Sequence, residues 1–120
     1  MTDHIYLSNM SFECHIGAGG GERAELQTIE MDVDLSLDLR DAGEADDLAR
    51  TADYGAVFEL CSSAAQEAQY HLLEGLAERV ARLILAAQPQ VESVAVSVRK
   101  PGVPIDGVLD YAGVRIERSR

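Results

Sequence analysis

The sequence predicts an α+β fold, in which a four-stranded antiparallel sheet carries two helices on one of its faces. Two observations lead to this prediction. The segments follow the order strand, strand, helix, helix, strand, strand, and strands grouped around a helical pair favour an antiparallel sheet with segregated helices. Residues 29–39 also alternate between apolar and mostly acidic side chains, so their strand has one buried and one wet face. A length of 120 residues suits one domain spanning residues 1–120.

A β-hairpin is predicted at the start of the chain. Residues 4–12, "HIYLSNMSF", roughly alternate and form its first strand, and residues 29–39, "IEMDVDLSLDL", form its second. Between them, four glycines fall within residues 17–21. A phosphate-binding loop of this kind would open a helix or carry Lys-Ser/Thr, whereas this run leads into a strand. We therefore predict a mobile hairpin loop whose glycines adopt positive φ.

Two amphipathic helices are predicted after a polar, turn-rich segment that begins at residue 40. The first starts near residue 54 with Asp53 as its N-cap, and its apolar stripe consists of Val57, Leu60, Cys61, Ala64 and Ala68. The second ends before Pro89, and its stripe consists of Leu72, Leu73, Leu76, Val80, Leu83, Ile84 and Ala87.

Two further strands complete the predicted sheet. Residues 91–100 place Val94, Val96 and Val98 on one face, and the prolines at 101 and 104 stop this strand. Residues 111–118 form the fourth strand. The two helices cover one face only, so the acidic face of residues 29–39 either meets bulk water or lines the wet interior of a symmetric oligomer.

Charge and composition exclude several classes of function. A net charge of -11 repels nucleic-acid phosphates and anionic lipids, so neither is an expected partner. Because the first ten residues lack a basic region followed by an apolar run, and no stretch approaches about 20 apolar residues, we expect neither a signal peptide nor a membrane-spanning segment. Cys14 and Cys61 lie far apart and are expected to be buried free thiols, which is typical of a cytoplasmic protein. The three histidines lack the spacing of a metal site, so we expect neither metal nor cofactor.

Four residues are candidates for chemistry: Glu22 after the glycines, Tyr54 and Glu74 at the helix starts, and Lys100, the one lysine of the chain. Each also has a purely structural interpretation. Glu22 could serve solubility, Tyr54 could pack, and Lys100 could be a surface residue at a strand end. A carboxylate at Glu74 is favoured by the helix dipole, but in a crevice it could also accept two parallel N–H donors from a heterocycle.

Three motifs follow Glu22 in a specific order: Asp-Tyr-Gly at 53–55, Leu-Leu-Glu at 72–74 and Lys-Pro-Gly at 100–102. This arrangement resembles the dihydroneopterin aldolases of folate biosynthesis over essentially the whole chain, from residue 5 to residue 118. The resemblance implies the T-fold (tunnelling fold), in which four subunits join their sheets around a tunnel and two such rings often stack into an octamer. The acidic face would then line the tunnel, and the sites would lie between neighbouring subunits.

The resemblance also implies how the substrate is bound. Glu74 would bind the ring N–H and the 2-amino group of the pterin, and Leu73 would add a backbone contact. Ala52 and Asp53 would contribute from the neighbouring subunit. Glu22 would bind the hydroxyl groups of the substrate side chain.

The catalytic residues implied by the resemblance are Lys100 and Tyr54, the latter from the neighbouring subunit. Lys100 would act as the acid–base group through a bound water, and Tyr54 would relay a proton to an enol-like intermediate. In 7,8-dihydroneopterin the ring C=N beside the side chain accepts the electrons of the broken bond, so the retro-aldol cleavage requires neither a metal nor a Schiff base.

Several alternatives remain open at the level of sequence. The chain has Cys14-His15-Ile16-Gly17 where many aldolases have an aromatic residue, His and Gly, and an Ile-Gly pair also occurs in the related dihydroneopterin triphosphate epimerase. That epimerase would need a cationic patch for the triphosphate, and no arginine cluster lies near the loop. A non-catalytic pterin or purine binder and an oligomeric scaffold are also compatible with the fold, although a scaffold would not need all four candidate residues. The choice between tetramer and octamer is likewise open.

Overall fold

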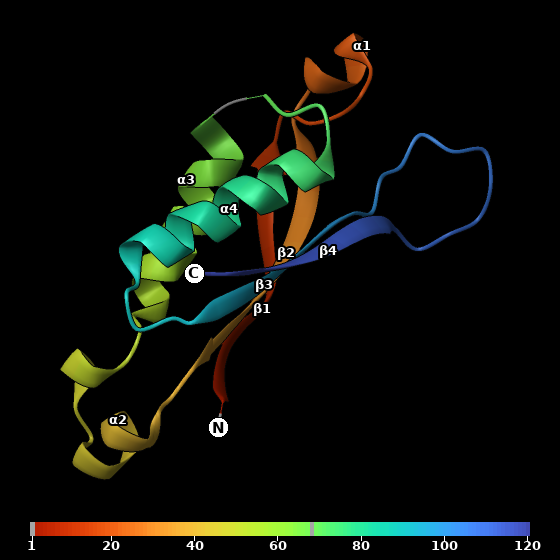
Figure 1. Ribbon diagram of the computed structural model, residues 1–120. Helices are drawn as coiled ribbons and strands as arrows, with labels where there is room; N and C mark the ends of the chain where they lie inside the picture. The colour runs from red at the N-terminus through yellow and green to blue at the C-terminus, as the bar shows by residue number, and fades with distance from the viewer. Residues whose placement is uncertain (1, 68) are drawn as a thin grey trace.

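The computed structural model describes residues 2–67 and 69–120, and it confirms the predicted α+β architecture (Figure 1). The elements are β1 (Asp3–Cys14), α1 (Gly20–Arg23), β2 (Gln27–Leu37), α2 (Arg40–Ala45), the 3-10 turn η1 (Leu48–Arg50), α3 (Tyr54–Glu67), α4 (Leu73–Ala87), β3 (Ser93–Lys100) and β4 (Ala112–Ser119). The four strands lie in the order β1-β2-β3-β4, and all neighbours are antiparallel. Both α3 and α4 lie on the same face of this sheet.

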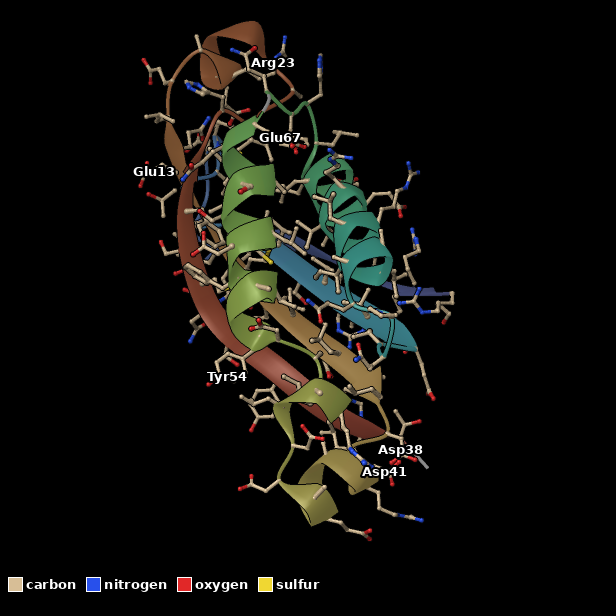
Figure 2. The ribbon with its side chains drawn as sticks, turned by 90° about the vertical axis from the view of Figure 1, so that its left-hand side faces the viewer. Glu13, Arg23, Asp38, Asp41, Tyr54 and Glu67 are labelled. Atoms are coloured by element: carbon tan, nitrogen blue, oxygen red, sulfur yellow. The ribbon has the colours of Figure 1, made fainter. Side chains whose placement is uncertain are left out.

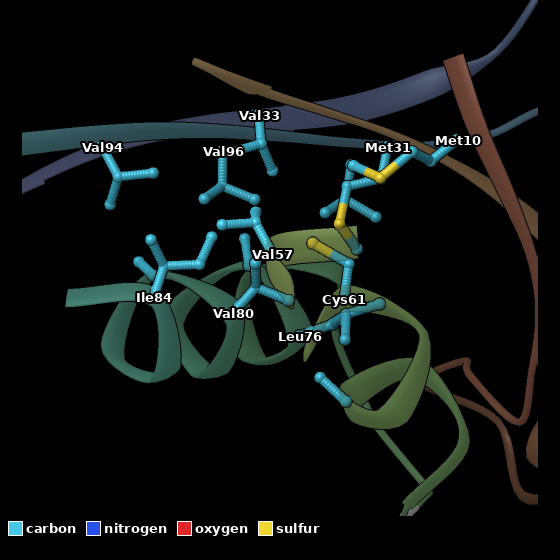
Figure 3. Close-up of a cluster of buried hydrophobic side chains, with 14 of the residues drawn as sticks. Met10, Met31, Val33, Val57, Cys61, Leu76, Val80, Ile84, Val94 and Val96 are labelled. Carbon is cyan, nitrogen blue, oxygen red and sulfur yellow. The ribbon is translucent and has the colours of Figure 1, made fainter. Parts of the chain in front are cut away.

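The hydrophobic core fills the space between the sheet and the two long helices. Figure 3 shows side chains from β2 and β3, among them Val33 and Val96, facing Val57 of α3 and Val80 and Ile84 of α4. These five side chains are at most 1% exposed. Burial of this mainly aliphatic surface provides the main stabilisation of the fold. The apolar side chains that alternate along residues 29–37 are thus those on the face of β2 that packs against the helices.

The predicted helical stripes are largely confirmed, with corrections at their ends. In α3, Cys61 and Ala64 are buried and Leu60 is partly buried, whereas Ala68 lies outside the described residues. In α4, Leu72 and Ala87 were expected in the buried stripe but both are exposed. They lie at the two limits of the helix, Leu72 as the N-cap residue with extended backbone and Ala87 as the last residue. Two alanines, Ala77 and Ala81, are buried in α4 beside the predicted stripe, and their small size lets the helix approach the sheet.

The second strand is shifted from its predicted position and spans 27–37 instead of 29–39. Its last residue, Leu37, pairs with Asp3, the first residue of β1, so the ladder ends there. Beyond that point, the Asp3 carboxylate accepts the N–H of Leu39 at 3.0 Å, and the Asp38 carboxylate accepts the N–H of Arg40 at 2.9 Å. Side-chain acceptors therefore replace the strand partner and turn the chain into α2.

Two loops predicted from their glycines and polar residues contain short helices. The turn-rich segment from residue 40 holds α2 and η1, and the carboxylate of Asp47 caps η1 through the N–H of Ala49 at 2.9 Å. In the glycine-rich loop, residues 20–23 form the helical turn α1. Gly17 is the one glycine of the described residues with positive φ, so the expectation that the whole run needs this conformation was wrong.

The second face of the sheet is polar, and no helix within residues 2–67 and 69–120 covers it, as predicted. Arg99 of β3 donates from Nε to Glu30 at 3.0 Å and from Nη1 to Asp32 at 2.6 Å. Asp32 also accepts the N–H of Asn9, which lies at the irregularity of β1 with a φ of 56°. Although desolvation opposes the effect, the hydrogen bonds from Asn9 and Arg99 and the Arg99 charge lower the pKa of Asp32 below its usual value. Charged side chains on this face therefore pair across strands.

None of the helices within the described ranges is long and apolar enough to cross a bilayer. Cys14 and Cys61 are buried free thiols, as predicted from their spacing. Burial raises the pKa of the Cys14 thiol to about 11 and that of the Cys61 thiol to about 12. Both therefore stay protonated and serve as small core side chains.

Candidate active site

The lysine at the end of β3 is buried and paired with a carboxylate. Lys100 continues the alternation of Val96 and Val98, so its side chain leaves the sheet on the face that carries the helices. Lys100 is only 6% exposed, and its Nζ forms an ion pair with Oε2 of Glu22. An ammonium group in such a place is tolerated because a carboxylate compensates its charge. The structure thus brings together two residues that are 78 positions apart in the sequence.

The glycine-rich loop positions the Glu22 side chain beside Lys100. Gly17 has a φ of 155°, and a Cβ atom built on it would overlap the side chain of Glu22. The side chain of Arg23 donates to the carbonyl oxygens of Gly17 and Ala18 at 3.0 and 2.9 Å. The loop is therefore held by its own side chains, whereas the sequence had suggested a mobile turn.

The start of α4 is tied to the same loop. Tyr70 bonds through its backbone to both His15 and Gly17, with N···O distances of 2.9 and 3.0 Å. Its hydroxyl donates to the carbonyl oxygen of Ala64 in α3 at 2.7 Å. Figure 1 shows the start of α4 at the same end of the sheet as α1. Tyr70 thereby places the first turn of α4 near the glycine-rich loop, a role that the sequence did not indicate.

Leu73 and Glu74 occupy this first turn, as predicted. Leu73 is partly buried against the core, whereas Glu74 is exposed. The free N–H groups of the helix start stabilise a carboxylate at this position. Leu73 and Glu74 therefore lie at the end of the molecule that carries the Lys100–Glu22 pair, with the Glu74 carboxylate accessible to a ligand.

The remaining predicted site residues lie far from this pair. Figure 2 shows Arg23, the neighbour of Glu22, at one end of the molecule and Tyr54 at the far end of α3. Tyr54 is the first residue of α3 and is 67% exposed. The carboxylate of Asp53 accepts the N–H of Ala56 at 3.1 Å, which confirms Asp53 as the N-cap of α3. Within one chain, the structure therefore separates the predicted site residues into two groups.

An apolar pocket of about 520 Å³ lies beside the second group. Its walls come from β1, α2 and the segment before α3, and they include Tyr6, Leu39, Ala52 and Tyr54. Tyr6 and Tyr54 at this pocket are 73% and 67% exposed. This end of the molecule thus presents a concave, apolar surface next to two predicted site residues.

The four-stranded antiparallel sheet with two helices on one face defines a protein of the T-fold class. A family profile described as dihydroneopterin aldolase matches residues 5–117. The chain belongs to the dihydroneopterin aldolase family. It is 39% identical to the dihydroneopterin aldolase of Streptomyces coelicolor over 118 residues, which cover 98% of each chain.

Two solved structures agree closely with the fold. A dihydroneopterin aldolase structure from Vibrio cholerae, described as putative, is 30% identical with a TM-score of 0.91, and the match covers 98% of each chain. The E. coli dihydroneopterin aldolase in complex with neopterin is also 30% identical, with a TM-score of 0.89 and coverage of 98% of this chain and 99% of the other. The predicted T-fold and the predicted family are thereby confirmed.

Proposed function

We propose that this chain cleaves 7,8-dihydroneopterin into 6-hydroxymethyl-7,8-dihydropterin and glycolaldehyde. The observation that carries the proposal is the buried Lys100–Glu22 ion pair, formed in a chain of the dihydroneopterin aldolase family. A buried amine beside a carboxylate is suited to move a proton at a substrate hydroxyl. The E. coli relative, whose structure holds neopterin, supports a pterin as the ligand.

In the proposed reaction, Lys100 acts through a bound water that removes the proton of the second side-chain hydroxyl. The bond between the first and second side-chain carbons then breaks, and glycolaldehyde leaves with a new C=O bond. The bonding electrons move into the ring C=N and give an enol-like intermediate. Tyr54 relays a proton to the first side-chain carbon, which completes the hydroxymethyl product.

Substrate binding in this proposal is divided among the remaining residues. Glu74 accepts two parallel N–H donors from the pterin ring, and its place in the first turn of α4 leaves its carboxylate accessible. Leu73 adds a backbone contact. Glu22 binds the side-chain hydroxyls while it compensates the charge of Lys100.

We further infer that Ala52, Asp53 and Tyr54 reach the pterin from a neighbouring subunit of a tetramer or octamer. The wide separation between Tyr54 and Arg23, the neighbour of Glu22, supports this arrangement (Figure 2). The free edges at β1 and β4 also support it, because exposed strand edges readily pair with another copy. Free thiols at Cys14 and Cys61 are consistent with a cytoplasmic enzyme.

The substitution Lys100→Ala tests the proposal. We expect turnover to fall by about 10²–10⁴-fold, the contribution typical of one acid–base group. Products from 7,8-dihydroneopterin and from its triphosphate would be separated by chromatography, which also distinguishes cleavage from epimerisation. Arg82→Ala is the matched control, because Arg82 is a cation that is 76% exposed on α4. Native turnover by a folded Lys100→Ala chain would contradict the proposed role.

A further inference from the structure

The first residue of β2 is polar at a position where the buried stripe of the strand would otherwise continue. Gln27 shares a face with Ile29 and Met31, both 0% exposed, and pairs across the sheet with the buried Cys14. It is partly buried. A polar side chain in such a place destabilises the fold unless hydrogen bonds satisfy its polar atoms.

Both amide hydrogens of Gln27 have partners in the glycine-rich loop. Its Nε2 donates to the carbonyl oxygens of Ile16 and Glu22, each at 2.8 Å. These two acceptors stand at the beginning and near the end of the loop. A single side chain therefore fastens both ends of segment 16–22 to the first residue of β2.

The fastened segment ends at the residue whose carboxylate pairs with Lys100. With the Glu22 backbone fixed at its carbonyl and Gly17 leaving room for the side chain, the carboxylate is directed toward Nζ of Lys100. Arg23 adds two bonds to loop carbonyls, but those bonds are to residues 17 and 18. The two bonds from Gln27 span the loop from its beginning to Glu22.

We propose that Gln27 is a positioning residue of the active site, which acts through Glu22 on the binding of the substrate side chain. It fixes the Glu22 carboxylate at Lys100 before substrate arrives, so the loop does not have to be ordered on binding. This inference rests on the proposed function, because it assigns Glu22 to the side-chain hydroxyls of dihydroneopterin.

The decisive variant is Gln27→Glu, which keeps the size of the side chain and replaces two donors by acceptors. Above pH 7 the new carboxylate would face two carbonyl oxygens, and the loop would separate from β2. We expect KM for 7,8-dihydroneopterin to rise about tenfold or more at pH 8, with a smaller change in kcat. Gln90→Glu adds the same charge at an exposed turn and should keep the native KM.

Acid should partly rescue this variant. A protonated carboxyl group carries one O–H donor and can restore one of the two bonds. The ratio of KM between Gln27→Glu and the native enzyme should therefore decrease from pH 8 to pH 5.5. Gln27→Leu should raise KM without such a pH dependence. A merely structural role would lower thermal stability but would not give a KM that recovers with acid.

Hydrogen exchange gives a second readout that does not require turnover. Amides of residues 17–23 should exchange faster in Gln27→Glu than in the native protein, whereas those of β3 should be unchanged. A native KM at pH 8, or a chain that fails to fold at every pH, would overturn the positioning role. Absence of turnover by the native chain would instead reject the proposed function. The hydrogen-exchange experiment would still test the role of Gln27 in the loop.

Discussion

At the scale of single residues, the Lys100–Glu22 pair depends on Gly17, a glycine of the loop that carries Glu22. Gly17 adopts a φ that L side chains rarely take, and a Cβ at this position would occupy the volume of the Glu22 side chain. Gly17→Ala is therefore expected to displace Glu22 and to raise KM for dihydroneopterin by about tenfold, the effect of losing one well-placed hydrogen-bonding group. Steady-state kinetics would check this expectation.

The control for this prediction lies in the same loop. A Cβ at Gly19 would meet no atom within 4 Å, and the φ of Gly19 is -85°, so Gly19→Ala should keep the native KM. Equal kinetics in the two variants would contradict the argument that Gly17 makes room for Glu22.

The sequence identified the candidate residues Lys100 and Glu22 better than the residues that position them. Lys100 and Glu22 were found because they stand in motifs of the right order, and the structure joins them. Their support by Gln27, Tyr70 and Gly17 was missed, because it consists of backbone carbonyls and N–H groups that sequence patterns do not reveal. The sequence did contain one signal of such a supporting residue: Gln27 is polar at a position that continues the buried stripe of β2.

At the scale of elements, the polar face of the sheet is held by a network that joins three strands. Arg99 of β3 binds Glu30 and Asp32 of β2 and reaches Asn9 in β1. Because the Asp32 pKa is lowered in the folded state, its carboxylate stabilises the fold above the ordinary aspartate pKa, and this contribution is lost as pH falls through the lowered value.

Asp32→Asn should consequently lower the free energy of unfolding at pH 7 by about 1 kcal/mol, the upper range for a partly exposed pair. The deficit relative to the native protein should shrink as pH falls below about 4, where an ordinary aspartate becomes protonated. Urea unfolding at a fixed protein concentration, repeated across pH, measures both effects. Asp106→Asn, in an exposed loop, should show no deficit at any pH.

Long elements were predicted well and short ones were missed, for a physical reason. The alternation of β2 and the stripe of α4 repeat over many residues, so each repeat reinforces the same assignment. The helices α1 and α2 contain 4 and 6 residues, too few for a periodic pattern. They are fixed by local contacts such as the bond from the Arg40 N–H to Asp38.

At the scale of the whole molecule, the predicted site residues of one chain fall into two separate groups, one with Lys100 and one with Tyr54. The molecule extends 52 Å along its long axis, and Tyr54 lies at the end of α3 that is remote from Arg23 in the glycine-rich loop. In the proposed oligomer, the two groups would meet between neighbouring subunits. A ring in which each subunit offers Lys100 to one neighbour and Tyr54 to the other would complete every site.

This arrangement predicts that two inactive variants restore activity in each other. Lys100→Ala and Tyr54→Phe should each be nearly inactive as pure proteins. In assemblies formed by refolding equal amounts together, a site with both residues intact arises when a Tyr54→Phe subunit supplies Lys100 and its neighbour supplies Tyr54. Random mixing gives this combination in about a quarter of sites, so about a quarter of native turnover is expected. If Lys100 and Tyr54 of the same chain formed the site, every subunit would keep one defect, and mixed assemblies verified with two affinity tags would stay inactive.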